Sequence, residues 1–378
     1  MIPLESEGGI VLILVARGIP FGDHHFALGG LAGSANEVDC RDLELILAHT
    51  APLWAELRGR RLFLTGGTGF FGCWLVESFC YVNRLLGLGA EMTILTRNPD
   101  AFAQKCPHLA SDPALTFHAG DVRNFVFPAG EFGYVIHAAT GARTKEAEDT
   151  PLDMLSTIIA GTERTLEFAA THRAQKFLLT SSGAVYGRQP AGLTHVPESY
   201  AGAPDSLVPA SVYAEGKRIS ELLCSIYQEK SSLECKIARC WAFCGPHLPL
   251  DQHFAVGNFI GDVLAGRPIQ ILGDGTPRRS YLYAADLVIW LWTLLFQAPA
   301  LVPFNVGSAR DVSILELAQA VAATLNPEAE IRMMGKAVQG AEPARYVPSI
   351  GRAREMLGLR EFTALEEAIR RTAAWNQE

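Results

Sequence analysis

The sequence predicts an α/β fold built on a doubly wound parallel sheet, with a smaller C-terminal lobe. Three observations predict it: short apolar runs alternate with longer amphipathic ones from about residue 60, the apolar runs are nearly continuous, and a glycine-rich turn follows the first of them. Strands that helices cover on both faces need such apolar runs, and β-α-β alternation is typical of a parallel sheet. The pattern therefore favours one sheet between two layers of helices.

The expected strands are short, mostly apolar runs, and the helices between them are longer and amphipathic. The strands are Arg61 to Thr65, Met92 to Thr96, Leu115 to His118, Tyr134 to Ala138, Lys176 to Ser181 and Lys236 to Cys240. The helices are Phe70 to Leu86, Pro151 to Thr171 and Tyr213 to Glu229, and Asp39 to Leu57 is expected to form one further helix that leads into the first strand. Gly187 to Pro209 is rich in Pro and Gly and is expected to be a loop.

Three parts are expected along the chain. Residues 1–38 have no clear period and many glycines, which indicates an N-terminal extension. Residues 39–240 hold the leading helix and the sheet domain. Residues 241–378 fall mainly into the smaller lobe, with 281–310 expected to return to the sheet domain.

Composition excludes several classes of protein. With 378 residues, 49% hydrophobic and 19% charged, the chain has ample material for a core, so disorder, collagen and a small disulfide scaffold are excluded. The formal charge is −8 and no basic block is present, which argues against binding to nucleic acid. The longest apolar runs, Ile10 to Ala16 and Leu287 to Phe296, are well short of the roughly 18 residues that span a bilayer, so no membrane association is expected.

The cysteines and the N-terminus indicate a cytoplasmic protein. Eight cysteines include no C-x-x-C pair, which fits buried, reduced thiols. No basic residue precedes the first apolar run, so a secretory signal is not expected. His24 and His25 have no third ligand at a metal-binding spacing, and no metal site is predicted.

The turn after the first strand reads Thr65-Gly66-Gly67-Thr68-Gly69-Phe70-Phe71-Gly72. Glycines at the first, fourth and seventh positions of the glycine run allow a tight turn, let backbone amides approach a pyrophosphate and pack helix against strand. The N-terminus of the helix adds positive potential. Between the first strand and the first helix of such an alternation, this motif predicts binding of a dinucleotide rather than a merely structural turn.

The ends of the next two strands bear on which dinucleotide binds. The second strand ends in Thr96-Arg97-Asn98, without the carboxylate that accepts from the ribose hydroxyl of NAD. A guanidinium pairs well with a 2′-phosphate, so Arg97 favours NADP(H), with NAD(H) as the alternative if Arg97 is only a solvated loop charge. Asp121 follows the third strand and is placed to accept from the adenine amino group; its alternative role is a turn or cap.

A phenol and an ammonium are set four residues apart in Tyr213-Ala214-Glu215-Gly216-Lys217, on one face of a helix. Lys217 is expected to lower the phenol pKa, so that Tyr213 exchanges a proton with a substrate hydroxyl during hydride transfer. Ser182, at the end of the fifth strand, is placed to share a hydrogen bond with the substrate oxygen. His137 at the end of the fourth strand is expected to be packed or to face the pyrophosphate, and Trp290, Trp292 and Phe296 are expected to be helix core.

From about residue 59 onward the chain resembles the extended short-chain dehydrogenase/reductase family, in its nucleotide-sugar epimerase/dehydratase branch. The motifs are TGGTGFFG, GDV, HAAT, TSSGAVYG, YAEGK, RCWAFCGP, GDGTPRRSYLYAAD and FNVGS. The resemblance implies a Rossmann domain with a substrate-binding lobe, and Ser182, Tyr213 and Lys217 as catalytic residues. It places Gly66, Gly69, Phe70, Phe71, Gly72, Arg97, Asp121, Val122, Ala138, Ala139 and Lys217 along the cofactor. It also implies that Ser182 and Arg279 bind the substrate, with Arg279 on the nucleotide diphosphate, and a homodimer through the helices at 151–171 and 213–229.

Departures from the family pattern reduce the number of reactions that we expect this chain to catalyse. Sugar 4,6-dehydratases of this branch carry an Asp-Glu pair where this chain has Gly183 and Ala184, and decarboxylating members keep a glutamate in the same stretch. Epimerases and keto reductases acting at C4 need only Ser, Tyr and Lys. Ala242 with Phe243, and Ile158, replace asparagines found in many relatives, which leaves the sugar open.

The sequence therefore predicts an NAD(P)-dependent enzyme that oxidises or reduces C4 of a nucleotide sugar, as a 4-epimerase or a 4-keto reductase. A 4,6-dehydratase is the first alternative. A non-catalytic NADP(H)-binding scaffold is the second, and it has no need for the complete set of Ser182, Tyr213 and Lys217.

Overall fold

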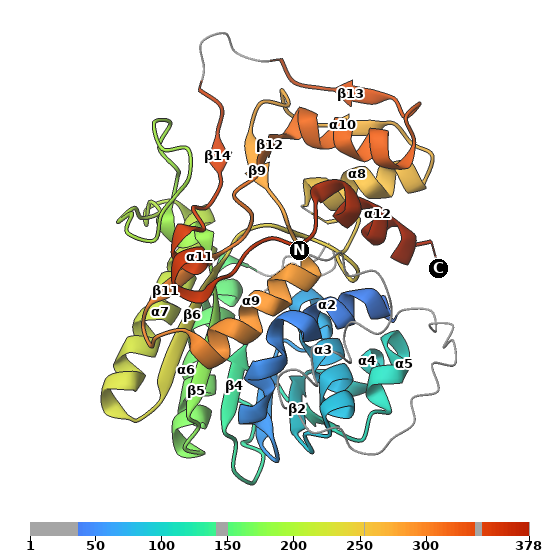
Figure 1. The fold of residues 1–378 in the computed structure, drawn as a ribbon. Coiled ribbons are helices and arrows are strands. Elements are labelled where there is room, and N and C mark those ends of the chain that lie inside the picture. Colours follow the sequence, from blue (N-terminus) through green and yellow to red (C-terminus); the bar gives the residue numbers. More distant parts are fainter. Residues whose placement is uncertain (1–36, 141–149, 253, 337–341, 378) are drawn as a thin grey trace.

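The computed structural model describes residues 37–140, 150–252, 254–336 and 342–377. Most of the predicted extension, residues 1–36, lies outside the described residues, together with the apolar run at Ile10 and the histidines at 24 and 25. The described chain is an α/β sheet domain with a smaller lobe above the carboxyl ends of its strands (Figure 1).

The central sheet has seven strands in the order β11-β6-β5-β4-β1-β2-β3, all paired in parallel. They are β1 (Arg61–Thr65), β2 (Glu91–Thr96), β3 (Leu115–Ala119), β4 (Tyr134–His137), β5 (Lys176–Ser182), β6 (Glu234–Cys240) and β11 (Pro303–Val306). The chain winds outward in both directions from β1, which confirms the predicted doubly wound fold. Each predicted strand is present, with ends that differ by up to two residues.

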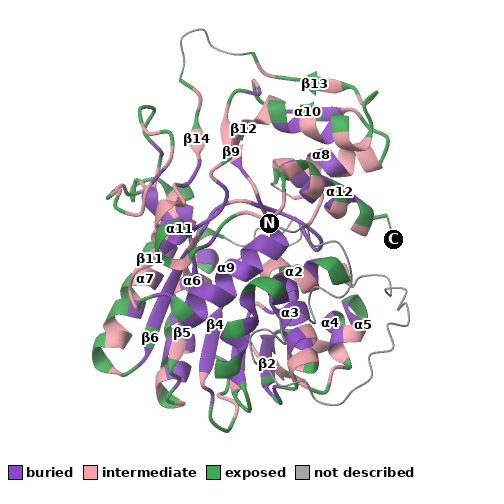
Figure 2. Cartoon of the chain, in the orientation of Figure 1, coloured by how far each residue is buried: buried purple, intermediate pink, exposed green. Residues whose placement is uncertain are grey.

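Helices cover the sheet on both faces (Figure 1). One layer consists of α2 (Cys40–Thr50), α3 (Phe70–Leu86) and α9 (Ala284–Gln297), whose apolar side chains share one core. The other consists of α6 (Pro151–Thr171) and α7 (Val212–Lys230), which pack against each other. Figure 2 shows β4, β5 and β6 mostly buried between these layers, as their apolar sequences require.

The prediction of a single helix from Asp39 to Leu57 is wrong. The α-helix ends at Thr50, and a 3-10 helix, η1, occupies Ala51–Leu57. Pro52 stands at the start of η1 and has no amide hydrogen, so it cannot donate to the carbonyl four residues earlier and continue the α-helix.

The remaining elements are short and lie mostly in the lobe or in connections. They are α4 (Pro99–Lys105), α5 (Pro107–Ala110), η2 (Gly183–Tyr186), η3 (Pro209–Ser211), β7 (Phe243–Cys244), α8 (Ala255–Leu264), β8 (Ile269–Ile271), β9 (Arg278–Ser280), β10 (Leu282–Tyr283), β12 (Asp311–Ser313), α10 (Ile314–Leu325), β13 (Ile331–Met333), β14 (Arg345–Tyr346), α11 (Gly351–Leu357) and α12 (Leu365–Trp375). Residues 284–306 leave the lobe: α9 packs on the sheet and β11 extends its edge. Among the described residues, no helix is long and apolar enough to cross a membrane.

Tryptophans from α9 and η1 pack together in the core. Trp290 and Trp292 are fully buried, as expected for helix core. The ring of Trp292 lies 4.6 Å from that of Trp54, and its Nε1 donates to Oγ of Ser78 at 2.9 Å. This contact joins η1, α3 and α9 in one packed layer.

Replacing Trp292 with alanine is expected to lower the free energy of unfolding by about 3–5 kcal/mol, because it removes a fully buried ring and leaves a cavity. Urea denaturation followed by circular dichroism measures the change. Met334→Ala, at a side chain 68% exposed, is the control and should change stability little. A loss below about 1 kcal/mol for Trp292→Ala would contradict the assignment of this residue to the core.

Candidate active site

The glycine-rich turn after β1 forms a cradle in which Gly66 and Gly72 leave no room for a side chain. Gly66 has φ +74°, and a Cβ there would lie 2.5 Å from the carbonyl carbon of Ala138. A Cβ on Gly72 would lie 2.2 Å from the carbonyl oxygen of Gly66. Gly69 is the N-cap of α3 and has no side chain to cap it, so the first helical amides, from Phe70 and Phe71 onward, stay available to an anion. These residues fit the pyrophosphate of a dinucleotide.

The end of β4 closes one side of this cradle. The amides of Ala138 and Ala139 donate to the carbonyl and hydroxyl oxygens of Thr65, at 3.1 and 3.2 Å. His137 is buried, with its ring nitrogens 2.8 Å from the hydroxyl of Thr65 and 3.2 Å from that of Thr162. Burial lowers the pKa of His137 to about 3, so the ring is neutral and joins β1 to α6.

Arg97 and Asp121 lie at the ends of β2 and β3, as predicted. Arg97 is exposed, and its charge helps to lower the pKa of Asp121. The largest cause of that lowering is Arg123, whose Nε and second terminal nitrogen donate to the two carboxylate oxygens at 2.8 Å each. Val122 packs close to Gly161 of α6. Asp121 thus serves as a turn residue here, and the cofactor roles of these three residues remain predictions.

Ser182, Tyr213 and Lys217 come together where β5 ends and α7 begins. Ser182 is 5% exposed and its hydroxyl accepts from the amide of Ala184 at 3.1 Å. Lys217 is 2% exposed; its Nζ donates to the carbonyl oxygen of Thr180 at 2.8 Å and lies 5.9 Å from the centre of the Tyr213 ring. One turn of α7 separates the phenol from the ammonium, as their sequence spacing predicts.

The electrostatics differ in one respect from the expectation. Burial raises the pKa of Tyr213 to about 12, and the interaction with the Ser182 hydroxyl acts in the opposite direction. Burial also lowers the pKa of Lys217 to about 8, and the ammonium is directed at a backbone carbonyl. The expected lowering of the phenol pKa by Lys217 is therefore not seen, because desolvation of the phenol dominates.

Two aromatic side chains that the sequence did not indicate complete the site. The rings of Trp241 and Tyr346 lie 4.4 Å apart, and both cover Gly183. A Cβ on Gly183 would lie 2.6 Å from the Trp241 ring and 2.8 Å from the Tyr346 hydroxyl. The Tyr346 hydroxyl also interacts with Ser182. No spacing in the sequence relates Gly183 to Tyr346, so only the fold reveals this contact.

Tyr346 brings the lobe to Ser182 and Tyr213. It lies on β14, where it pairs with Arg279 of β9, and the Arg279 guanidinium is 5.8 Å from the centre of its ring. Arg279 is partly buried and donates to the carbonyl oxygen of Arg278 at 2.8 Å. Arg279, which is predicted to bind the substrate, therefore lies next to Tyr346 on the lobe side of the site.

A partly buried ion pair, which the sequence did not indicate, supports the floor of the site. Glu221 of α7 accepts from Nε and a terminal nitrogen of Arg239, at 3.0 and 2.7 Å, and from the hydroxyl of Ser181 at 2.5 Å. The pair raises the pKa of Arg239 although burial opposes the rise. It ties α7 to β5 and β6 immediately below Ser182.

Comparisons with known proteins identify the family of this chain. Residues 62–307 match the model of the NAD dependent epimerase/dehydratase family. UDP-glucuronic acid decarboxylase 2 of Arabidopsis thaliana is 30% identical over 318 residues, which cover 84% of this chain and 68% of that protein. UDP-glucuronic acid decarboxylase 1 of the same plant is 31% identical over 312 residues, covering 82% and 68%.

Solved structures show the same fold. A UDP-glucose 4-epimerase of Thermotoga maritima, solved with UDP-glucose, superposes with a TM-score of 0.70 at 20% identity, covering 84% of this chain and 98% of that one. A dTDP-glucose 4,6-dehydratase of Streptomyces venezuelae, solved with NAD, gives 0.69 at 23% identity, covering 84% and 97%. With the family model covering residues 62–307, the chain belongs to the NAD-dependent epimerase/dehydratase family, within the extended short-chain dehydrogenases/reductases.

Proposed function

We propose that this protein is an NAD(P)-dependent enzyme that oxidises or reduces C4 of a nucleotide-linked sugar, as a 4-epimerase or a 4-keto reductase. One observation carries the proposal: Ser182, Tyr213 and Lys217 gather at one end of the sheet, and the position that follows Ser182 is closed by Trp241 and Tyr346. The site has its proton-transfer residues but no room for an acidic side chain at 183.

Each residue has a role that its surroundings support. A bound nicotinamide dinucleotide supplies hydride exchange with the sugar carbon. Tyr213 takes or returns the proton of the sugar hydroxyl, and Ser182, which interacts with that phenol, holds the same oxygen. Lys217 is anchored on the carbonyl of Thr180 and places its charge beside the phenol.

Dehydration and decarboxylation are less well supported by the geometry. By family resemblance, members that perform these reactions carry carboxylates in the stretch where this chain has Gly183 and Ala184. A Cβ on residue 183 would already lie 2.6 Å from the Trp241 ring, so an acidic side chain there would collide with it. The decarboxylase names of the two Arabidopsis relatives make UDP-glucuronic acid a necessary member of the substrate panel.

Arg97 supports NADP(H) over NAD(H) as the dinucleotide. Its exposed guanidinium lies at the end of β2, where a carboxylate would otherwise accept from the ribose of NAD. Among the described residues, no carboxylate accepts a hydrogen bond from the Arg97 guanidinium. The nearby carboxylate of Asp121 accepts from Arg123 instead. A 2′-phosphate is a suitable partner for such a guanidinium.

Replacing Tyr213 with phenylalanine is expected to lower kcat by about 10²–10⁴-fold, because the proton-transfer group is lost, while dinucleotide affinity is retained. Turnover is measured with a panel of nucleotide sugars, including UDP-glucose, dTDP-glucose and UDP-glucuronic acid. Tyr346→Phe, which removes only one hydroxyl from the same site, should lower kcat by roughly 2–10-fold. Full activity of Tyr213→Phe, or formation of a 4-keto-6-deoxy or decarboxylated sugar, would overturn the assignment.

The dinucleotide released when the freshly purified protein is denatured is expected to carry the additional 2′-phosphate. Mass spectrometry gives both its identity and its stoichiometry. Nearly one molecule per chain supports an epimerase that recycles its cofactor, whereas a site that fills reversibly supports a reductase. Arg97→Ala should weaken NADP(H) binding by roughly tenfold or more and leave NAD(H) binding unchanged. Equal effects on both dinucleotides would refute the role of Arg97.

We further propose a homodimer through α6 and α7. These helices pack together on one side of the sheet, and Leu222 on α7, which is 59% exposed, gives this helix pair a large apolar side chain at its surface. Leu222→Glu is expected to convert a dimer into a monomer in light scattering, because it places a charge in the apolar contact. Leu272→Glu, at an 83% exposed residue of the lobe, is the control and should leave the mass unchanged. A monomeric wild-type protein at micromolar concentration would refute the dimer.

A further inference from the structure

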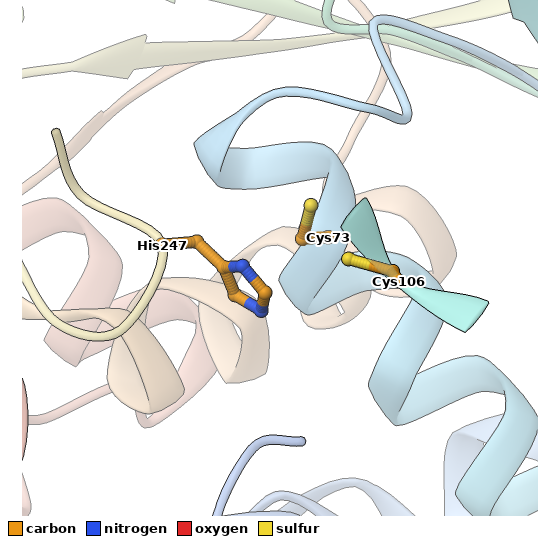
Figure 3. Close-up of side chains that lie close together, drawn as sticks. All are labelled: Cys73, Cys106 and His247. Atoms are coloured by element: carbon orange, nitrogen blue, oxygen red, sulfur yellow. The ribbon is translucent and has the colours of Figure 1, made fainter. Parts of the chain in front are cut away.

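Two cysteines and a histidine that are far apart in the sequence converge away from the catalytic residues (Figure 3). Cys73 lies in the first turn of α3, Cys106 joins α4 to α5, and His247 lies between β7 and α8. All three are buried, and their sulfur and nitrogen ligand atoms lie within 4.8 Å of one another. We call these residues the Cys-Cys-His cluster.

The histidine of this cluster has no partner of its own. His247 is 5% exposed, and both of its ring nitrogens are buried without a hydrogen bond to any described residue. Its ring is held by Trp375, at 4.7 Å between ring centres. Buried polar groups in folded proteins nearly always have a partner, so an imidazole held in this way beside two thiols indicates a ligand that it binds.

The chemistry of the three side chains identifies the class of ligand. Thiolates and imidazole are preferred by Zn²⁺ and related soft or borderline ions, not by Mg²⁺ or Ca²⁺, which take oxygen. Two thiolates balance the charge of a divalent ion, so the site can be buried without a net charge. With Zn–S bonds of about 2.3 Å and Zn–N bonds of about 2.1 Å, a tetrahedral site brings its ligands to within about 4 Å of one another. The observed separations, of up to 4.8 Å, exceed this value by less than about 1 Å.

A second histidine lies beside the cluster in the arrangement that zinc-binding histidines usually have. Nε2 of His108 is 2.8 Å from Oε1 of Glu77, and its Nδ1 is buried without a partner in the described part of the chain. A carboxylate that fixes one ring nitrogen leaves the other oriented for a metal. His108 is two residues beyond Cys106, but it is not among the residues whose ligand atoms lie within 4.8 Å of one another, so the fourth ligand position falls to water in this arrangement.

We propose that Cys73, Cys106 and His247 bind a structural zinc ion. The ion joins three segments: the helix that follows the cofactor turn, the α4–α5 connection and the chain that enters the lobe. A hydrogen bond from Nε1 of Trp74 to the carbonyl oxygen of Pro246, 2.9 Å long, already holds two of these segments together. The zinc ion therefore fixes the lobe against the cofactor-binding helix.

Metal analysis of the full-length protein tests the proposal. After growth with added zinc and removal of any metal-binding tag, wild type is expected to hold about one zinc per chain. His247→Asn and Cys106→Ala should each retain less than about a tenth of it. Asparagine suits position 247 because the backbone there has φ +67°, which Asn tolerates. Cys235→Ala is the matched control, since Cys235 is also buried beside another thiol, that of Cys224, and should keep the wild-type zinc content.

A measurement on wild type covers the case in which the variants fail to fold. Adding Co²⁺ to the zinc-depleted protein should produce thiolate-to-cobalt charge-transfer absorption that one equivalent of Zn²⁺ abolishes. Wild type with less than about a tenth of a zinc ion per chain and no such absorption would overturn the proposal. A disulfide between Cys73 and Cys106, found by peptide mapping of the freshly purified protein, would overturn it as well.

Discussion

The backbone that leaves β1 passes so close to the backbone that leaves β4 that no side chain fits between them. A Cβ on Gly66 would meet the carbonyl carbon of Ala138 at 2.5 Å, and one on Gly72 would meet the carbonyl oxygen of Gly66 at 2.2 Å. This contact sets the start of α3, aims its free amides at one point and brings the ends of β1 and β4 together. The glycine-rich turn, and the group of Ser182, Tyr213 and Lys217 at the end of the neighbouring strand β5, are positioned relative to it.

The side chains of the site come from two parts of the chain, the sheet domain and the lobe. The sheet domain supplies Ser182, Tyr213 and Lys217 from a rigid strand end and a helix that the Glu221 ion pair ties to the sheet. The lobe supplies Tyr346 from a two-residue strand that its neighbour β9 holds in register. Ser182, Tyr213 and Lys217 therefore belong to the sheet domain, and Tyr346 reaches them from the lobe.

Local physics explains which expectations hold and which do not. Helices α3 and α6 match the expected residues because their apolar period, and for α6 a Thr150–Asp153 capping box, fix their ends locally. The segment at 39–57 has the period of one helix, but a single proline within it breaks the hydrogen-bond pattern. The pKa of Tyr213 also departs from expectation, because burial by residues distant in the sequence outweighs the nearby lysine.

The sequence by itself determined the parallel sheet, the glycine turn and the Tyr213–Lys217 pair, because strand composition, φ above zero and helical spacing are properties of neighbouring residues. Only the tertiary structure decided that Tyr346 and Trp241 close the space over Gly183, and that Cys73, Cys106 and His247 meet. The contact over Gly183 and the meeting of the Cys-Cys-His cluster have the same physical cause. Contacts between residues more than 30 positions apart arise from how helices and strands pack, and side-chain volume and burial, which no local pattern encodes, then decide what chemistry the site retains.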